Sequence, residues 1–199
     1  MQRILAILSL LLVGLIGISL TTDVRAGDKK KDSGGIPKVE RGPEHKVLES
    51  WTGVFDATVK VYFPDPTKPS ASKGVMTRTM ILGGNFLQES YQGEFFGAPF
   101  SGMGVIGFNN VKKKFTTTWF DSTSTSMMLM EGTYDEKTKT LTMVGDDYEP
   151  NTKKKMKARD VLKITGADTQ TFEMFRLPDG ETKEFKIMEI AYTRKKVKQ

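Results

Sequence analysis

From Gly53 onward the chain alternates apolar and polar residues with a period of two. The clearest example is the segment 55–63, FDATVKVYF, in which every second residue is apolar. Successive side chains of a β-strand point to opposite faces, so this pattern predicts a strand with one buried face. Nine further strand-like runs follow at short spacing: 75–82, 86–94, 100–108, 114–121, 126–134, 140–147, 156–165, 171–177 and 184–194.

The connections between these runs are short and contain Gly, Asn, Asp and Pro, and a longer loop is expected at residues 64–74. Strands that follow one another without intervening helices predict a barrel or a sandwich. Closure into a barrel removes exposed strand edges, so we expect a single antiparallel up-and-down β-barrel of about ten strands. A short helix at residues 43–50, with Pro43 at its start, is expected before it.

The first 26 residues have the layout of a secretory signal peptide. Arg3 precedes an uncharged, mostly apolar run at residues 4–20, and Val24-Arg25-Ala26 forms a small-residue cleavage site. The apolar run is only marginally long for a membrane span, which needs about 20 residues. We therefore expect cleavage after Ala26, export to the periplasm or medium without stable membrane insertion, a disordered linker at 27–42 and a barrel domain at 43–199.

The net charge of +6 comes largely from lysine runs beside turns and at chain ends. Solvated lysines at these places protect strand edges, and an exported protein rarely meets nucleic acid, so we expect no nucleic-acid partner. The chain contains no cysteine. That absence excludes a cysteine nucleophile, a disulfide framework and a lipid-modified cysteine anchor.

Catalytic residue patterns are sparse. His45 is the only histidine and no nucleophile-elbow motif accompanies it, so a Ser-His-Asp triad, a zinc site and a haem ligand are all disfavoured. Four carboxylates on predicted strands remain candidates for acid–base chemistry, although solvent-facing or ion-paired roles are favoured. These are Asp121, Glu131, Glu173 and Glu189. We expect no enzymatic activity, no metal and no cofactor.

The sequence resembles a bacterial family known as domain of unknown function 1579. The resemblance includes the EHxxL of residues 44–48 and implies an exported protein with a lipocalin-like fold and no established activity. It rests on the order and spacing of short motifs: GGNFL (83–87), GAPFSG (97–102), GFNN (107–110), WFDST (119–123), EGTYD (131–135), KTLT (139–142), FEMF (172–175), PDG (178–180) and MEIAYTRK (188–195).

One position departs from the family pattern. The family commonly has Gly-x-Trp where the first strand begins, and this chain has Gly53-Val54-Phe55. The resemblance implies that the ring packs against an arginine of the last strand, and Arg194 is at the matching place. We expect Phe55 and Arg194 to close one end of the barrel through a cation–π contact.

The candidate ligand site follows from alternation on two neighbouring strands. Phe115 and Trp119 share one face of their strand, and Met128 and Met130 share one face of the next. We expect these four side chains to line a cavity for a small apolar or amphipathic ligand, with Arg159 as a partner for a ligand carboxylate if it points inward.

Two function classes remain open: a barrel that binds a small hydrophobic ligand, and an envelope interaction or assembly protein with a solid barrel. Met127 and Leu129 make the opposite face of their strand apolar as well, so self-association through the outer surface is the alternative.

Overall fold

The computed structural model describes residues 40–63, 65–149 and 152–196. The expected signal peptide at residues 1–26 lies outside the described residues, as does the linker up to residue 39. Among the described residues, no helix is both long enough and apolar enough to cross a membrane.

One helix and ten strands make up the described part of the chain. The expected helix is present as α1 (Pro43–Ser50), with proline in its first turn. The strands are β1 (Gly53–Val61), β2 (Ser70–Ile81), β3 (Phe86–Phe95), β4 (Ala98–Asn109), β5 (Lys114–Asp121), β6 (Met128–Asp135), β7 (Thr140–Tyr148), β8 (Lys155–Ile164), β9 (Thr169–Pro178) and β10 (Phe185–Arg194). A single turn of 3-10 helix, Leu82–Gly84, joins β2 to β3.

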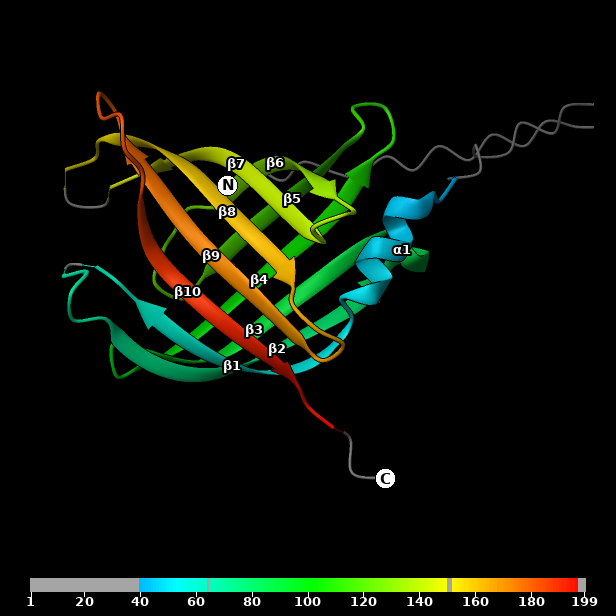
Figure 1. Cartoon of the computed structure of the whole chain (residues 1–199), viewed down its shortest axis with the longest axis horizontal. Coiled ribbons are helices and arrows are strands. Elements are labelled where there is room, and N and C mark those ends of the chain that lie inside the picture. The colour runs from blue at the N-terminus through cyan, green and yellow to red at the C-terminus, as the bar shows by residue number, and fades with distance from the viewer. Residues whose placement is uncertain (1–39, 64, 150–151, 197–199) are drawn as a thin grey trace, which may run out of the picture. The chain divides into compact units, whose positions relative to one another are not determined.

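Each strand pairs antiparallel with its neighbours in the sequence, and β1 also pairs with β10 (Figure 1). The sheet is therefore a closed barrel without a free edge strand. The prediction of an antiparallel up-and-down barrel of about ten strands after a short helix is confirmed.

The start of β2 differs from the sequence-based expectation. Residues 70–74 were expected to continue a loop, but they pair with Ala57–Val61 of β1 in register Val61↔Ser70. Serine, lysine and glycine favour a loop locally, and pairing with a long neighbouring strand overrides that preference. Two other boundaries shift inward, because β1 ends at Val61 and β6 begins at Met128.

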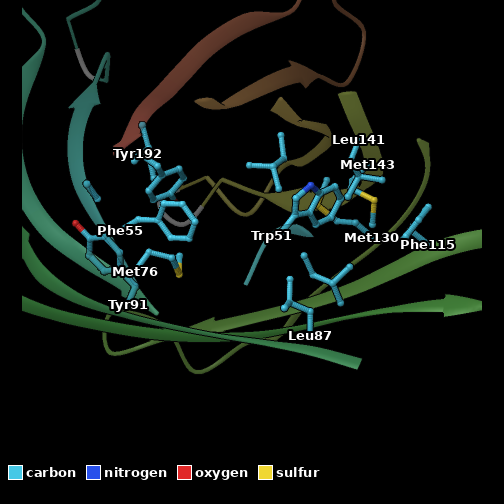
Figure 2. Packing of buried hydrophobic residues seen from close by; sticks show 14 of the residues in the cluster. Trp51, Phe55, Met76, Leu87, Tyr91, Phe115, Met130, Leu141, Met143 and Tyr192 are labelled. Atoms are coloured by element: carbon cyan, nitrogen blue, oxygen red, sulfur yellow. The ribbon is translucent and has the colours of Figure 1, made fainter. Parts of the chain in front are cut away.

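α1 covers the end of the barrel at which β1 begins (Figure 1). Trp51, the residue that ends the helix, is fully buried and its ring lies 6.4 Å from Phe115 and 6.0 Å from Tyr134 (Figure 2). His45 is also buried, and its Nδ1 accepts a hydrogen bond from the Gly42 N–H at 3.1 Å. The single histidine therefore caps the helix that closes this end of the barrel.

The opposite end, where β1 finishes and β10 starts, has no helix over it among the described residues (Figure 1). We call it the open end. Alternation along the strands assigns one set of side chains to the interior, and their burial changes along the barrel axis. Toward α1 they are fully buried, as at Phe55, Leu87 and Leu141, and they form the hydrophobic core.

Candidate functional site

The interior near the open end is lined by large apolar side chains that are only half-buried. Trp119 of β5 lies opposite Met128 of β6, and Met174 of β9 lies opposite Met188 of β10. All four face inward and each keeps accessible surface, and Trp119, Met128 and Met188 also pack against the core. The wall of the open end therefore offers apolar surface that the protein itself does not cover.

Trp119 is held flat against β4 by two glycines. A Cβ at Gly102 would lie 2.3 Å from Cζ2 of the indole, and a Cβ at Gly104 would lie 3.1 Å from Cε3. The Nε1 of Trp119 donates a hydrogen bond to Asp121 Oδ2 at 3.0 Å. The absence of side chains on these glycines gives the ring its place along the wall, and Asp121 fixes its orientation.

The structure separates the four side chains that the sequence grouped together. Trp119 and Met128 are cross-strand neighbours with accessible surface, as expected for a binding wall. Phe115 and Met130 also face inward, but they are buried, with exposed fractions of 2% and 4%. Phe115 packs 5.0 Å from the Phe108 ring within the core beneath α1, which places it with the packing that closes the barrel.

Arg159 does not face the interior, so its expected role as an inward partner for a carboxylate is wrong. It lies between the buried residues Ala158 and Asp160 on β8 and therefore points outward. Its guanidinium forms two hydrogen bonds with Glu184 and lies 4.0 Å from the centroid of the Phe175 ring. The outward ion pair holds the pKa of Glu184 below its usual range.

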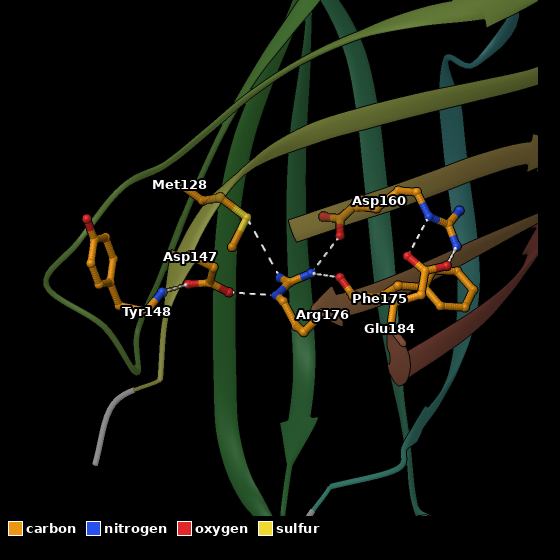
Figure 3. Close-up of polar contacts among 8 residues, drawn as sticks. Met128, Asp147, Tyr148, Asp160, Phe175, Arg176 and Glu184 are labelled. Atoms are coloured by element: carbon orange, nitrogen blue, oxygen red, sulfur yellow. Dashed lines mark hydrogen bonds and ion pairs between the residues drawn. The ribbon is translucent and has the colours of Figure 1, made fainter. Parts of the chain in front are cut away.

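The interior arginine near the open end is Arg176, on β9. Its Nε bonds Asp147 Oδ2 at 2.7 Å, and its Nη1 bonds Asp160 Oδ1 and the Phe175 carbonyl at 2.9 Å each (Figure 3). The remaining Nη2 lies 4.0 Å from the sulfur of Met128, a weak acceptor. Burial raises the pKa of Asp160 to about 6, against the opposing pull of Arg176.

A second buried arginine lies toward α1. Arg78 bonds Glu89 Oε1 at 2.7 Å and Gln170 Oε1 at 2.6 Å, and its guanidinium lies 4.7 Å from the centroid of the Tyr192 ring. Because carboxylate, amide and ring surround it, this arginine is fully engaged by the fold. It links β2, β3 and β9 across the interior.

Only the alternation of buried positions along β8 and β3 could have predicted that Asp160 and Glu89 face inward. Asp160 is flanked two residues away by Ala158 and Leu162, and Glu89 is flanked by Leu87 and Tyr91, so each shares the face of buried residues. The carboxylates that the sequence singled out lie elsewhere. Glu131 pairs with Lys112, Glu173 and Glu189 pair with Lys186, and Asp121 holds Trp119.

Two buried polar atoms have no hydrogen-bond partner among the described residues. They are Nε1 of Trp51 and the hydroxyl of Tyr91, in side chains exposed by 0% and 4%. A buried donor without an acceptor costs about 1–3 kcal/mol, so a water molecule or a ligand that bonded either atom would stabilise it. No group of three or more His, Asp or Glu residues within the described ranges is arranged to hold a metal ion.

Two hollows are present on the surface. The smaller, of about 390 Å³, lies beside the open end and is lined by Tyr62, Phe63, Pro66, Phe185 and Lys186. The larger, of about 920 Å³, lies mainly on the outer face of the sheet, and we call it the outer groove. Its apolar and polar lining comes from Phe86, Val105, Gly107, Lys114, Thr116, Thr117, Thr118, Met127, Leu129, Met130, Glu131, Val144, Gly145, Asp146 and Lys157.

Solved structures share this barrel. Rv2717c from Mycobacterium tuberculosis is 14% identical, with a TM-score of 0.59 over 79% of this chain and 100% of that one. The S-type phycobiliprotein lyase CPES from Guillardia theta is 9% identical, with a TM-score of 0.51 over 78% of this chain and 94% of that one. At such identities the likeness shows the fold alone.

No curated protein matches the chain. The motifs from the EHxxL of residues 44–48 to the MEIAYTR of residues 188–194 lie within a longer family match. Over residues 40–194 the chain matches the family described as "Protein of unknown function (DUF1579)", and it belongs to that family.

Proposed function

We propose that the barrel binds a small apolar or amphipathic ligand inside its open end. The observation that carries this proposal is the accessible apolar wall formed by Trp119, Met128, Met174 and Met188. Side chains that face the inside of a closed barrel are normally covered by one another, and here they keep accessible surface. Methionine adapts its shape to varied apolar partners, and the flat indole of Trp119 offers a stacking surface.

Polar groups beside the apolar wall support an amphipathic ligand. Arg176 sits near Met128, with two of its nitrogens already bound to carboxylates. The interior thus combines apolar walls with a few fixed polar groups, a composition typical of ligand pockets.

Tryptophan fluorescence tests the proposal directly. The protein without its first 26 residues is titrated with N-phenyl-1-naphthylamine and, separately, with decanoate, while indole emission and probe emission are followed. Saturable binding with quenching or energy transfer from Trp119 is the expected result. Trp119→Phe removes that signal and leaves the signal of Trp51, which is buried beneath α1.

Two matched measurements decide the interpretation. Native mass spectrometry of protein purified from its own source shows whether a small molecule accompanies the chain. Phe120→Ala removes an outward-facing aromatic residue next to Trp119 and is expected to leave the titration unchanged. Absence of saturable binding for every probe, together with native mass spectra free of small molecules, would overturn the ligand-binding proposal.

The second candidate function is an interaction protein whose barrel is solid. The exposed apolar side chains on the outer face favour it, with exposed fractions of 56% at Met127, 63% at Leu129 and 55% at Val144. Contiguous apolar surface of this kind marks sites of association. Sedimentation velocity over a concentration series separates this function from ligand binding, because only the former predicts a concentration-dependent complex.

We also propose that the chain is exported and acts as a binding protein without catalysis. The signal-like first 26 residues support export, and the sparse catalytic motifs support a binding role. N-terminal sequencing of the protein from the culture medium or periplasm tests export, with a mature chain beginning near Gly27 as the expected result. A chain that retains Met1 and fractionates with membranes would contradict it.

A further inference from the structure

The wall of the barrel is incompletely hydrogen-bonded between β6 and β7 near the open end. The ladder between these strands runs from Asp135↔Thr140 to Met130↔Gly145 and stops there. Beyond that point residues 128–129 of β6 still pair with β5, and residues 146–148 of β7 still pair with β8. We call the unpaired stretch between residues 128–129 and 146–148 the β6–β7 seam.

A side chain from a third strand bridges the seam in place of the backbone ladder. Arg176 of β9 reaches Asp147 of β7 through Nε at 2.7 Å and Met128 of β6 through Nη2 at 4.0 Å (Figure 3). Asp147 Oδ1 in turn accepts the backbone N–H of Tyr148 at 2.8 Å. The contact to β6 is a thioether contact, which is weak, so the two strands are held together less firmly here than along a ladder.

The outer groove lies over the same part of the wall. Its lining includes Leu129, Val144 and Asp146, whose positions face outward on either side of the seam. It also includes Met130 and Gly145, whose positions face inward. Apolar side chains therefore lie on both faces of β6 here: Leu129 lines the groove outside, and Met128 forms the accessible wall with Trp119 inside.

We propose that the ligand of this barrel enters sideways through the β6–β7 seam from the outer groove, and that the entering part is an unbranched alkyl chain. This inference rests on the proposed ligand-binding function and adds its route and the shape of the ligand. The flexible side chains of Met127, Leu129 and Met130 line the outer groove, and Met128 between them faces the interior beside Trp119.

The shape of the route selects the alkyl chain. Paired strands lie about 4.8 Å apart and an extended hydrocarbon chain is about as wide, so the chain passes when the two strands separate by roughly one further strand spacing, and in the seam no backbone ladder has to break for that separation. Methionine side chains move aside at low cost, because their rotamers interconvert easily. The charged groups at the rim, Lys114, Glu131, Asp146 and Lys157, have both signs and leave the polar end of the ligand at the surface until the chain is inserted.

A covalent cross-link across the seam tests the route. Leu129→Cys with Asp146→Cys places two thiols across the seam on the outer face, and the chain has no other cysteine. Cross-linking with 1,2-bis(maleimido)ethane, verified by mass spectrometry, ties β6 to β7. Stopped-flow association of decanoate, followed through the indole emission of Trp119, is expected to slow by about tenfold or more after cross-linking, with dissociation slowed in parallel.

The matched control ties the same two strands inside their ladder. Thr133→Cys with Thr142→Cys are cross-strand partners, and their cross-link is expected to leave association rates within about twofold of the untreated protein. Equal rates for the seam-locked and untreated protein would overturn the lateral route and leave ligand binding intact. Failure of the untreated double variant and of the unmodified chain to bind any probe would instead overturn the proposed function.

A second copy of the chain is the competing occupant of the outer groove. Sedimentation velocity of the unmodified protein, with Val144→Asp as the comparison, distinguishes it. A monomer with and without the substitution supports the groove as a ligand path. A dimer that Val144→Asp dissociates, with probe kinetics unchanged, would overturn the inference and identify the groove as an interface between copies.

Discussion

The guanidinium carbon of Arg194 lies 4.6 Å from the centroid of the Phe55 ring, and the two residues are register partners on the last and first strands. Nη1 of the same arginine donates a hydrogen bond to the Thr52 carbonyl at 2.6 Å. The contact that the family resemblance implied is therefore present, with phenylalanine in place of tryptophan. Arg194 therefore connects β10 to the start of β1 and to Thr52, which joins α1 to β1, at the point where the sheet closes.

Arg194→Ala is expected to lower the free energy of unfolding by about 1–3 kcal/mol, because it removes a cation–π contact and leaves a carbonyl without its donor. Chemical denaturation of the two proteins measures the change. Lys195→Ala is the matched control, since it removes the same charge one residue later from an exposed side chain paired with Asp56. Equal midpoints for Arg194→Ala and the wild type would show that the contact does not stabilise the barrel.

Gly102→Ala is expected to displace the indole of Trp119, because the added Cβ would lie 2.3 Å from a ring carbon. Overpacking of this kind costs about 1–3 kcal/mol of stability. The fluorescence emission of Trp119, isolated by comparison with Trp119→Phe, should shift in the same variant. Ser101→Ala alters the exposed neighbouring position and should do neither; an unshifted emission in Gly102→Ala would contradict the flat packing of the ring.

The sequence predicted the helix and the ten strands because each rests on local pattern, and it predicted closure of the barrel because an open sheet would leave strand edges exposed. Alternation in segments such as 55–63 gives the inner face of a strand, and turn residues give its ends. The start of β2 at Ser70 escaped prediction because residues 70–74 are strand only through pairing with β1. No local preference of Ser, Lys or Gly carries that information.

The candidate site was predicted in part for a related reason. Alternation placed Trp119 and Met128 correctly on the inner face. Depth along the axis depends on strand tilt and on the helix that closes one end, and sequence pattern shows neither, so Phe115 was grouped with them. The mixed pattern of KARDVL at residues 157–162 hid which of Arg159 and Asp160 faces inward, and the pairing of β8 with β7 and β9 decides it.

Arg159→Ala is expected to leave the affinity for N-phenyl-1-naphthylamine unchanged within about twofold, because the side chain points away from the interior and contacts an outer ion pair, typically worth about 0–1 kcal/mol. Trp119→Ala, which removes part of the accessible wall, is expected to weaken the same binding by about tenfold. Fluorescence titrations of both variants provide the measurement. A larger loss for Arg159→Ala than for Trp119→Ala would place the ligand on the outer face.

The last prediction concerns Asp160, an almost fully buried carboxylate beside Arg176. In an unfolded chain an aspartate titrates near pH 4, whereas burial raises the pKa of Asp160 to about 6 in the folded protein. Between these two values the folded state binds more protons than the unfolded state. The contribution of Asp160 to stability is therefore fully present below about pH 4 and is lost as the pH rises to about 6.

Asp160→Asn carries no titrating group at this position, so the free energy of unfolding of the wild type minus that of the variant should fall between about pH 4 and about pH 6. Denaturant titrations at half-unit pH steps give this difference and cancel the carboxylates common to both proteins. Asp146→Asn is the matched control, because lysines 155 and 157 lower the pKa of that exposed carboxylate. Its difference should rise with pH, and only at acidic values below about 4. A difference for Asp160→Asn that stays flat or rises across the window would mean that Arg176 outweighs burial and keeps Asp160 ionised.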